Sequence, residues 1–142
     1  MKIVDNKINT TVEIIQSGNP ILRKKAIEVN ISNIKKPKIQ KVLKNMSEAL
    51  HSQDDGVAIA APQIGVSLRI FVVSGRIFDE DFIRGKDSNQ DDLYKKIHSP
   101  DLIFINPILK KISTDKKLLD EGCLSVRPIY GRVHDKPIQM VC

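Results

Sequence analysis

Residues 56–65 read GVAIAAPQIG and are expected to form a loop between a helical pattern and a strand pattern. Small side chains let another chain lie close to this backbone, whose amides can then pair with an extended peptide as an added strand would. Gln63 is the only residue of the run with a polar side chain. It either bonds the local backbone or serves a bound ligand, and this stretch alone favours the first interpretation.

The segments on either side predict one helix and one strand. Residues 54–56 read DDG and end the predicted helix, while residues 67–73 read SLRIFVV and predict a buried strand. Before them, residues 38–53 predict a helix with a single buried stripe and lysines opposite. The apolar residues at helical spacing are Ile39, Val42, Leu43, Met46 and Leu50.

The remaining segments favour an α+β fold, because a helix followed by strands with hairpin-length connections does not suit a doubly wound sheet. Ser17 to Pro20 form a turn cluster, and residues 21–23 predict a short turn or helix. We expect an irregular excursion at 75–100 with a short helix near 91–97. The other predicted strands are 102–106, 108–112, 117–120 and 138–141.

Length and composition predict a single domain over residues 1–142, since a chain of 142 residues with 41% hydrophobic residues can bury a core. No apolar stretch approaches the ~20 residues that cross a bilayer, and the charged N-terminus lacks a signal-peptide core. We therefore expect a cytoplasmic protein without a membrane partner. The net charge of +6 comes from scattered lysines, which usually mark a solvated surface, and RNA remains an alternative partner.

A second motif, EGCLS at residues 121–125, contains a cysteine directly after a glycine. A lone cysteine is usually a small hydrophobe in a core. Gly122, however, frees the backbone to bring the Cys123 thiolate to a metal, and the amide that follows can point to the same place. Both interpretations stay open. Cys142, the other cysteine, is not expected to pair with it in a reducing compartment.

The two motifs together resemble the peptide deformylase family, whose patterns are G-x-G-(aliphatic)-A-A-x-Q-x-G and E-G-C-L-S. The sequence FINP at residues 104–107 is similar to the family's asparagine-proline turn, and the resemblance runs from about residue 14 to residue 140. It implies an N-terminal helix packed on antiparallel or mixed β-sheets. It also implies hydrolytic removal of the N-formyl group from the N-terminal methionine of new polypeptides, with iron or zinc as the metal.

The resemblance assigns roles to residues of both motifs. Cys123 would be the thiolate ligand, and the side-chain amide of Gln63 and the backbone N–H of Leu124 would steady the oxyanion. N-formylmethionyl peptides would be the ligands, and the ribosome a possible partner. The implied substrate-binding residues are Gly56, Val57, Ala58, Leu119, Glu121 and Gly122.

Departures from the family pattern affect these expectations. Ala58 stands where the family commonly has its second glycine, which adds a methyl group where the substrate backbone approaches. More importantly, the chain contains no H-E-x-x-H segment, in which two histidines on one helix face supply metal ligands. Its three histidines, His51, His98 and His134, have no partner four residues away.

In the family, by the resemblance, the H-E-x-x-H helix comes after the point that corresponds to Cys142, so we expect residues 1–142 to form an incomplete domain without deformylase activity. Such a chain is either a fragment of an active deformylase or a decayed homologue, and the sequence leaves both open. Loss of that helix would leave an uncovered sheet face and favour self-association. The alternative function is a non-catalytic basic module that binds peptide or ribosomal RNA.

Overall fold

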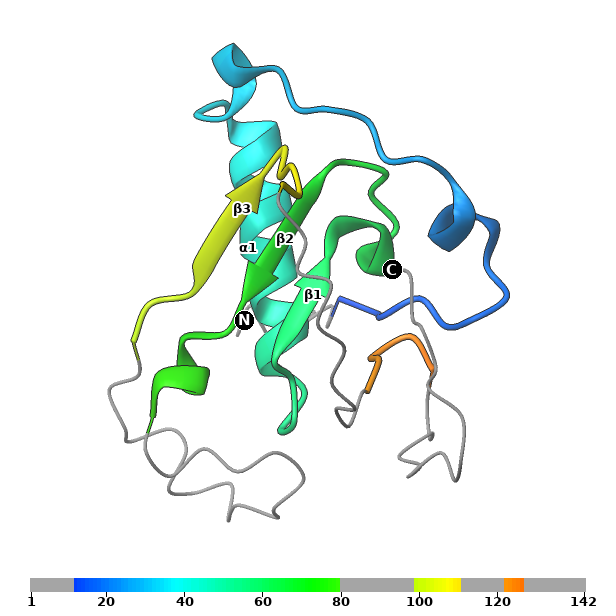
Figure 1. Ribbon diagram of the computed structural model, residues 1–142, viewed down its shortest axis with the longest axis vertical. Helices are drawn as coiled ribbons and strands as arrows, with labels where there is room; N and C mark the ends of the chain where they lie inside the picture. Colours follow the sequence, from blue (N-terminus) through cyan, green and yellow to red (C-terminus); the bar gives the residue numbers. More distant parts are fainter. Residues whose placement is uncertain (1–11, 80–98, 111–121, 127–142) are drawn as a thin grey trace, which may run out of the picture.

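The computed structural model describes residues 12–79, 99–110 and 122–126. These residues form one α-helix, a three-stranded antiparallel sheet and four short 3-10 turns, which confirms the predicted α+β fold (Figure 1). The elements are α1 Pro37–His51, β1 Ala58–Ala60, β2 Ile70–Val73 and β3 Leu102–Ile105, with 3-10 turns at Pro20–Arg23, Ile31–Asn33, Ala61–Ile64 and Gly75–Phe78.

Helix α1 forms where the apolar stripe predicts it. Pro37 starts the helix at a position whose backbone N–H would have no helical partner. The helix ends at His51, two residues before the predicted end, and Ser52 donates its N–H to the carbonyl of Glu48. Its buried residues, Ile39, Leu43, Met46, Ala49 and Leu50, form nearly half of the core.

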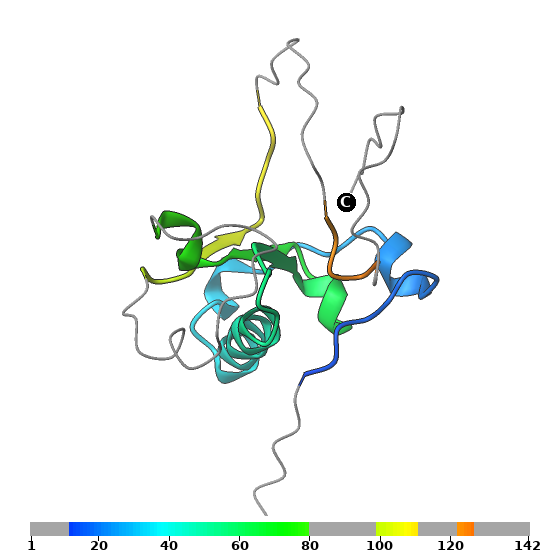
Figure 2. The same cartoon turned by 90° about the horizontal axis from the view of Figure 1, so that it is seen from below.

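The sheet has the order β1-β2-β3, with β2 in the centre. Ile59 of β1 lies opposite Val72 of β2, and both are buried, as is Ile70. Because side chains alternate along a strand, these three residues share one face of the sheet. Seen from below, α1 lies end-on along one side of the sheet (Figure 2). The core is therefore the layer between α1 and this face.

Two predictions near β1 and β2 need correction. The stretch 56–65, expected to be a loop, contains strand β1 and a 3-10 turn. The strand predicted at 67–73 begins only at Ile70, because the backbone before it bonds another partner. The N–H of Ile27 donates to the carbonyl of Ser67 at 3.0 Å, and that of Arg69 donates to the carbonyl of Ile27 at 2.8 Å.

Strand β3 ends at Ile105, and the next residue, Asn106, adopts a left-handed conformation with φ of 52°. Its side-chain amide bonds the backbone of Val29 in the way that a neighbouring strand would. Oδ1 accepts the N–H of Val29 at 2.8 Å, and Nδ2 donates to the carbonyl of Val29 at 2.8 Å. The predicted strand 102–106 is thus confirmed over its first four residues. Residues 108–110 are not a strand, and the segments predicted at 91–97, 117–120 and 138–141 lie outside the described residues.

The short helical turn predicted at 21–23 is confirmed as part of Pro20–Arg23. No helix among the described residues is both long and apolar enough to span a membrane.

Candidate active site

The two sequence motifs meet at the side chain of Gln63. Its Nε2 donates to Ser125 Oγ at 3.0 Å and lies 3.9 Å from Cys123 Sγ. Gln63 comes from the 3-10 turn that follows β1, and the two partners come from the turn at residues 122–126. The fold therefore brings a side-chain amide and a thiol together from distant parts of the sequence.

The orientation of the Gln63 amide is fixed by its own backbone neighbourhood. Oε1 accepts the N–H of Ala60 at 2.8 Å, and only the oxygen of an amide can accept from an N–H. The two hydrogens on Nε2 must therefore face the Cys123 turn. The local-backbone interpretation of Gln63 is thus confirmed at Oε1, and Nε2 bonds the second motif, while a role toward a bound ligand stays a prediction.

The outer edge of β1 presents backbone groups at Ala58. Val57 directs its carbonyl toward β2, where it accepts the N–H of Ser74 at 2.8 Å. Residues of an antiparallel strand alternate in direction, so the N–H and C=O of Ala58 point away from β2. In the part of the chain that is described, no strand pairs with this edge, and Ala58 is exposed. One donor and one acceptor thus remain available to an extended chain.

Gly56 and Val57 lie between α1 and this edge. Gly56 is buried, and a Cβ there would come within 2.6 Å of the Leu50 carbonyl oxygen, so only glycine lets the chain pass this close to the helix end. Val57 and Gly122 are half-buried. Leu119 and Glu121, the other predicted substrate-binding residues, lie outside the described residues.

The turn that carries Cys123 is held by the N-terminal segment. Gln16 Nε2 donates to the Leu124 carbonyl at 3.0 Å, and the N–H of Ser17 donates to the Ser125 carbonyl at 2.6 Å. Sequence reasoning missed both residues, because nothing in a polar N-terminal stretch indicates a partner more than a hundred residues away. Among the described residues, no acceptor takes the N–H of Leu124.

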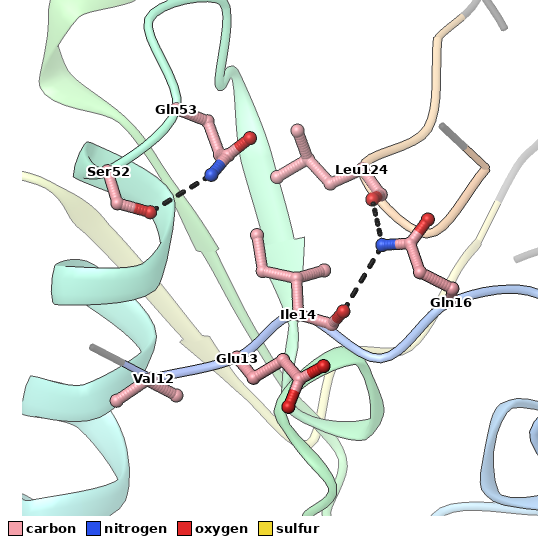
Figure 3. Close-up of a pocket in the computed structure, with 7 residues that line it drawn as sticks. All are labelled: Val12, Glu13, Ile14, Gln16, Ser52, Gln53 and Leu124. Carbon is pink, nitrogen blue, oxygen red and sulfur yellow. Dashed lines mark hydrogen bonds between the residues drawn. The ribbon is translucent and has the colours of Figure 1, made fainter. Parts of the chain in front are cut away.

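A pocket of about 400 Å³ lies beside this turn (Figure 3). The Gln16 amide lies between the carbonyls of Ile14 and Leu124 and bonds to both. Of the predicted site residues that the structure describes, Leu124 alone lines the pocket. The lining consists of Val12, Glu13, Ile14, Gln16, Ser52, Gln53 and Leu124.

The described residues supply one candidate metal ligand and not a complete set of ligands. Cys123 is a free, half-buried thiol that could serve as a ligand. Over residues 12–79, 99–110 and 122–126, no three His, Cys, Asp or Glu side chains cluster closely enough to hold a metal. His51 is bound elsewhere: its Nε2 lies 2.9 Å from both carboxylate oxygens of Asp101.

Curated proteins that resemble the chain are peptide deformylases. Peptide deformylase 1A of Arabidopsis thaliana, named chloroplastic/mitochondrial, is 38% identical over 114 residues, which are 80% of this chain and 41% of the relative. The peptide deformylase of Desulforudis audaxviator is 33% identical over 121 residues, which are 85% of this chain and 62% of the relative. The chain thus spans about half the length of the curated relatives that it matches.

Solved structures agree on the fold. A Met-Ala-Ser complex of class I type b peptide deformylase from Acinetobacter baumannii superposes with a TM-score of 0.63 at 24% identity, over 82% of this chain and 66% of that one. The Ehrlichia chaffeensis peptide deformylase gives a TM-score of 0.61 at 29% identity, over 84% and 60% of the two chains. The polypeptide deformylase family model matches residues 11–136. The chain belongs to the polypeptide deformylase family.

Proposed function

We propose that this chain carries the peptide-binding and oxyanion-stabilising part of a deformylase that removes the N-formyl group from the N-terminal methionine of new polypeptides. Peptide deformylases are metal-dependent hydrolases, and iron or zinc is the proposed metal here. One observation carries the proposal: the Gln63 amide, anchored through Oε1, turns its donors toward Cys123.

The geometry suggests how a formylated peptide binds. An extended peptide pairs with the N–H and C=O of Ala58 and brings its formyl group between Gln63 and Leu124. When water adds to the formyl carbon, negative charge develops on the carbonyl oxygen. The N–H groups of Gln63 Nε2 and Leu124 can donate to that oxygen, and one such donor is worth about 10²–10³ in turnover in other hydrolases. The C–N bond then breaks, and formate and the free amine leave.

Cys123 is proposed as the thiolate ligand of the metal. The 142 residues hold no two histidines four residues apart, so the remaining ligands are not recognisable in them. We therefore expect the 142-residue chain to bind formyl-methionyl peptide without releasing formate. The proposed setting is the cytoplasm, with the ribosome as a source of substrate.

The test is formate release from a formyl-methionyl peptide under reducing, oxygen-free conditions, with iron, nickel or zinc supplied. The expected result is peptide binding with no turnover for any metal. Turnover that Cys123→Ala abolishes would show that His51, His98, His134 or a second subunit completes the site, and the expected inactivity would be wrong. Failure to bind the peptide at all would contradict the proposed function.

A basic surface supports a second candidate, a module that binds anionic partners such as ribosomal RNA. Five exposed lysines lie directly before α1 and in its first half, and no acidic residue occurs from position 29 to position 47. RNA binding that weakens steeply with salt would support it, since each phosphate contact releases counterions. Binding with no salt dependence would exclude it. The lysines are Lys35, Lys36, Lys38, Lys41 and Lys44.

Self-association is proposed for the sheet face opposite α1. Phe71 and Phe104 stack there, with ring centroids 4.5 Å apart, and Leu102 and Phe104 are each 40% exposed. Exposed apolar surface of this kind favours contact with a second copy of the chain.

A further inference from the structure

Arg76 is a buried cation whose partners, in the described part of the chain, are all uncharged. It follows β2 in the turn Gly75–Phe78 and is 5% exposed. Its guanidinium donates to the backbone carbonyls of Gln53 at 3.0 Å, Asp54 at 3.4 Å and Gly56 at 3.4 Å. A buried charge is costly unless hydrogen bonds replace its hydration, so these carbonyls are what stabilise it there.

The three carbonyls belong to the turn by which the chain leaves α1. The turn lies next to the C-terminus of α1, whose last carbonyls form the negative end of the helix and favour a nearby cation. The rigid fork of an arginine can hold several acceptors in fixed relative positions, which a single ammonium cannot do. Arg76 therefore sets the shape of the turn at residues 53–56 as well as satisfying its carbonyls.

The same side chain connects this turn to the end of β2. Arg76 Nε donates to Ser74 Oγ at 3.3 Å, and the N–H of Ser74 donates to the Val57 carbonyl at 2.8 Å. Ser74 is fully buried. The guanidinium thus fixes the chain on both sides of Gly56, directly before Ala58 turns its backbone outward.

We propose that Arg76 is a positioning residue for peptide binding: it fixes the turn at residues 53–57 and thereby the register and direction of the β1 edge at Ala58. This inference rests on the proposed function. Arg76 touches no substrate in this account and acts only through the turn. Removal of the Arg76 side chain should weaken peptide binding by loosening the β1 edge at Ala58. It should not move the side chains of Gln63 and Cys123.

The experiment compares Arg76→Gln and Arg76→Lys with Arg69→Gln. Arg69 is a matched control, since it also donates to a backbone carbonyl, that of Pro107 at 2.7 Å, but at the other end of β2. Amide exchange is read at Gly56 and Ser74, whose N–H groups bond within the turn, and at Met46 and Leu50 in the core. Affinity for the tripeptide Met-Ala-Ser is measured in parallel.

Arg76→Gln should speed exchange at Gly56 and Ser74 and weaken Met-Ala-Ser binding, each by about tenfold, the size expected for losing hydrogen bonds to a charged group. Arg76→Lys should give a smaller change, and Arg69→Gln none at these sites. Unchanged exchange at Gly56 and Ser74, or equal acceleration at Met46 and Leu50, would overturn the proposal. If Arg76→Gln does not fold, Arg76→Lys decides by the same criteria.

The two readouts separate this inference from the function on which it rests. If the unsubstituted chain fails to bind Met-Ala-Ser, the proposed function fails and the peptide-binding role of Arg76 with it. The exchange readout would still show whether Arg76 fixes the turn. If the peptide binds normally and Arg76→Gln binds it equally well, only the inference about Arg76 is overturned.

Discussion

At the scale of single residues, the site depends on which end of the Gln63 amide faces which partner. The N–H of Ala60 holds Oε1, so the donors on Nε2 face Cys123 and Ser125 before any ligand arrives. Donors fixed in advance stabilise developing charge without reorganisation when the reaction occurs. The amide that bonds the local backbone is therefore the same group that we propose as the oxyanion donor.

Gln63→Glu tests the donor role with little change in shape. Glutamate can still accept the Ala60 N–H but presents an oxygen where Nε2 donates. The preference for a formylated over an unformylated methionyl peptide should fall about tenfold, the size of a lost hydrogen bond to the formyl oxygen. Binding of the two peptides is compared by calorimetry.

The matched control for this substitution is Gln40→Glu, which changes the net charge equally on an exposed part of α1. It should leave the preference unchanged. An equal loss in both variants would mean that charge, and not the donor at Gln63, sets the preference.

Asp101 gives the chain a predictable response to acid. Burial alone would raise the pKa of Asp101, but hydrogen bonds from His51, the Gly75 N–H and Ser47 outweigh it and lower the pKa below its ordinary value. Folding therefore favours the carboxylate. This stabilisation is complete above the aspartate pKa of the unfolded chain, about 4, and is lost as the pH falls through the lower folded value.

Asp101→Asn should consequently lower the free energy of unfolding near neutral pH and make its decline below about pH 4 shallower. Urea titrations over a pH series measure this, with the exposed Asp54→Asn as control. The same acid dependence in Asp101→Asn as in the unsubstituted chain would contradict the assignment.

At the scale of elements, the sequence predicted the helix and the strands whose own residues show a clear hydrophobic pattern. The stripe from Ile39 to Leu50 predicts α1, and the β-branched and aromatic run before Ser74 predicts β2. Strand β1 was missed because alanine has low strand propensity, and its three residues are extended by pairing with β2. The start of β2 was predicted too early because the backbones of Ser67 and Arg69 form hydrogen bonds with Ile27, which is far away in the sequence.

The sequence predicted which residues belong to the candidate site but not how they are arranged in space. The first motif indicated Gln63 and the second indicated Cys123. The bonds by which Gln16 and Ser17 anchor the cysteine turn have no local signal in the sequence. Arg76 was missed for a similar reason, since a single arginine after a strand reads as a surface residue. Its partners are backbone carbonyls, which leave no trace in the identity of the residues that provide them.

Asn106 joins β3 to the N-terminal segment, and two substitutions separate its two roles. Asn106→Gly removes the amide bonds to Val29 but tolerates the positive φ, whereas Asn106→Ala also introduces strain. Both should be destabilising, and the alanine variant more so by about 1–2 kcal/mol. Urea unfolding measures the difference. Equal stability of the two variants would show that the left-handed conformation costs nothing here.

At the scale of the whole molecule, one face of the sheet is covered by α1, and the other carries exposed apolar side chains. Phe71, Val73, Leu102 and Phe104 share that second face, because they lie opposite one another in the register of β2 and β3. In the described part of the chain, no helix covers them (Figure 2). This arrangement is what the proposed self-association requires.

Leu102→Ser should shift the isolated chain toward monomer in sedimentation velocity across a concentration series. Ile31→Ser is the control, since Ile31 is 80% exposed in a different part of the fold. It should leave the association unchanged. A monodisperse monomer that unfolds cooperatively at every concentration would rule out self-association through this face.

The most direct test of the account is a titration of the ¹⁵N-labelled 142-residue chain with a formyl-methionyl tripeptide, followed by NMR. Pairing at the β1 edge and donation to the formyl oxygen predict shifts at the backbone amides of Ala58 and Leu124 and at the side-chain amide of Gln63. No shift at these groups with saturating peptide, or shifts confined to the lysine-rich start of α1, would contradict the assignment of this site.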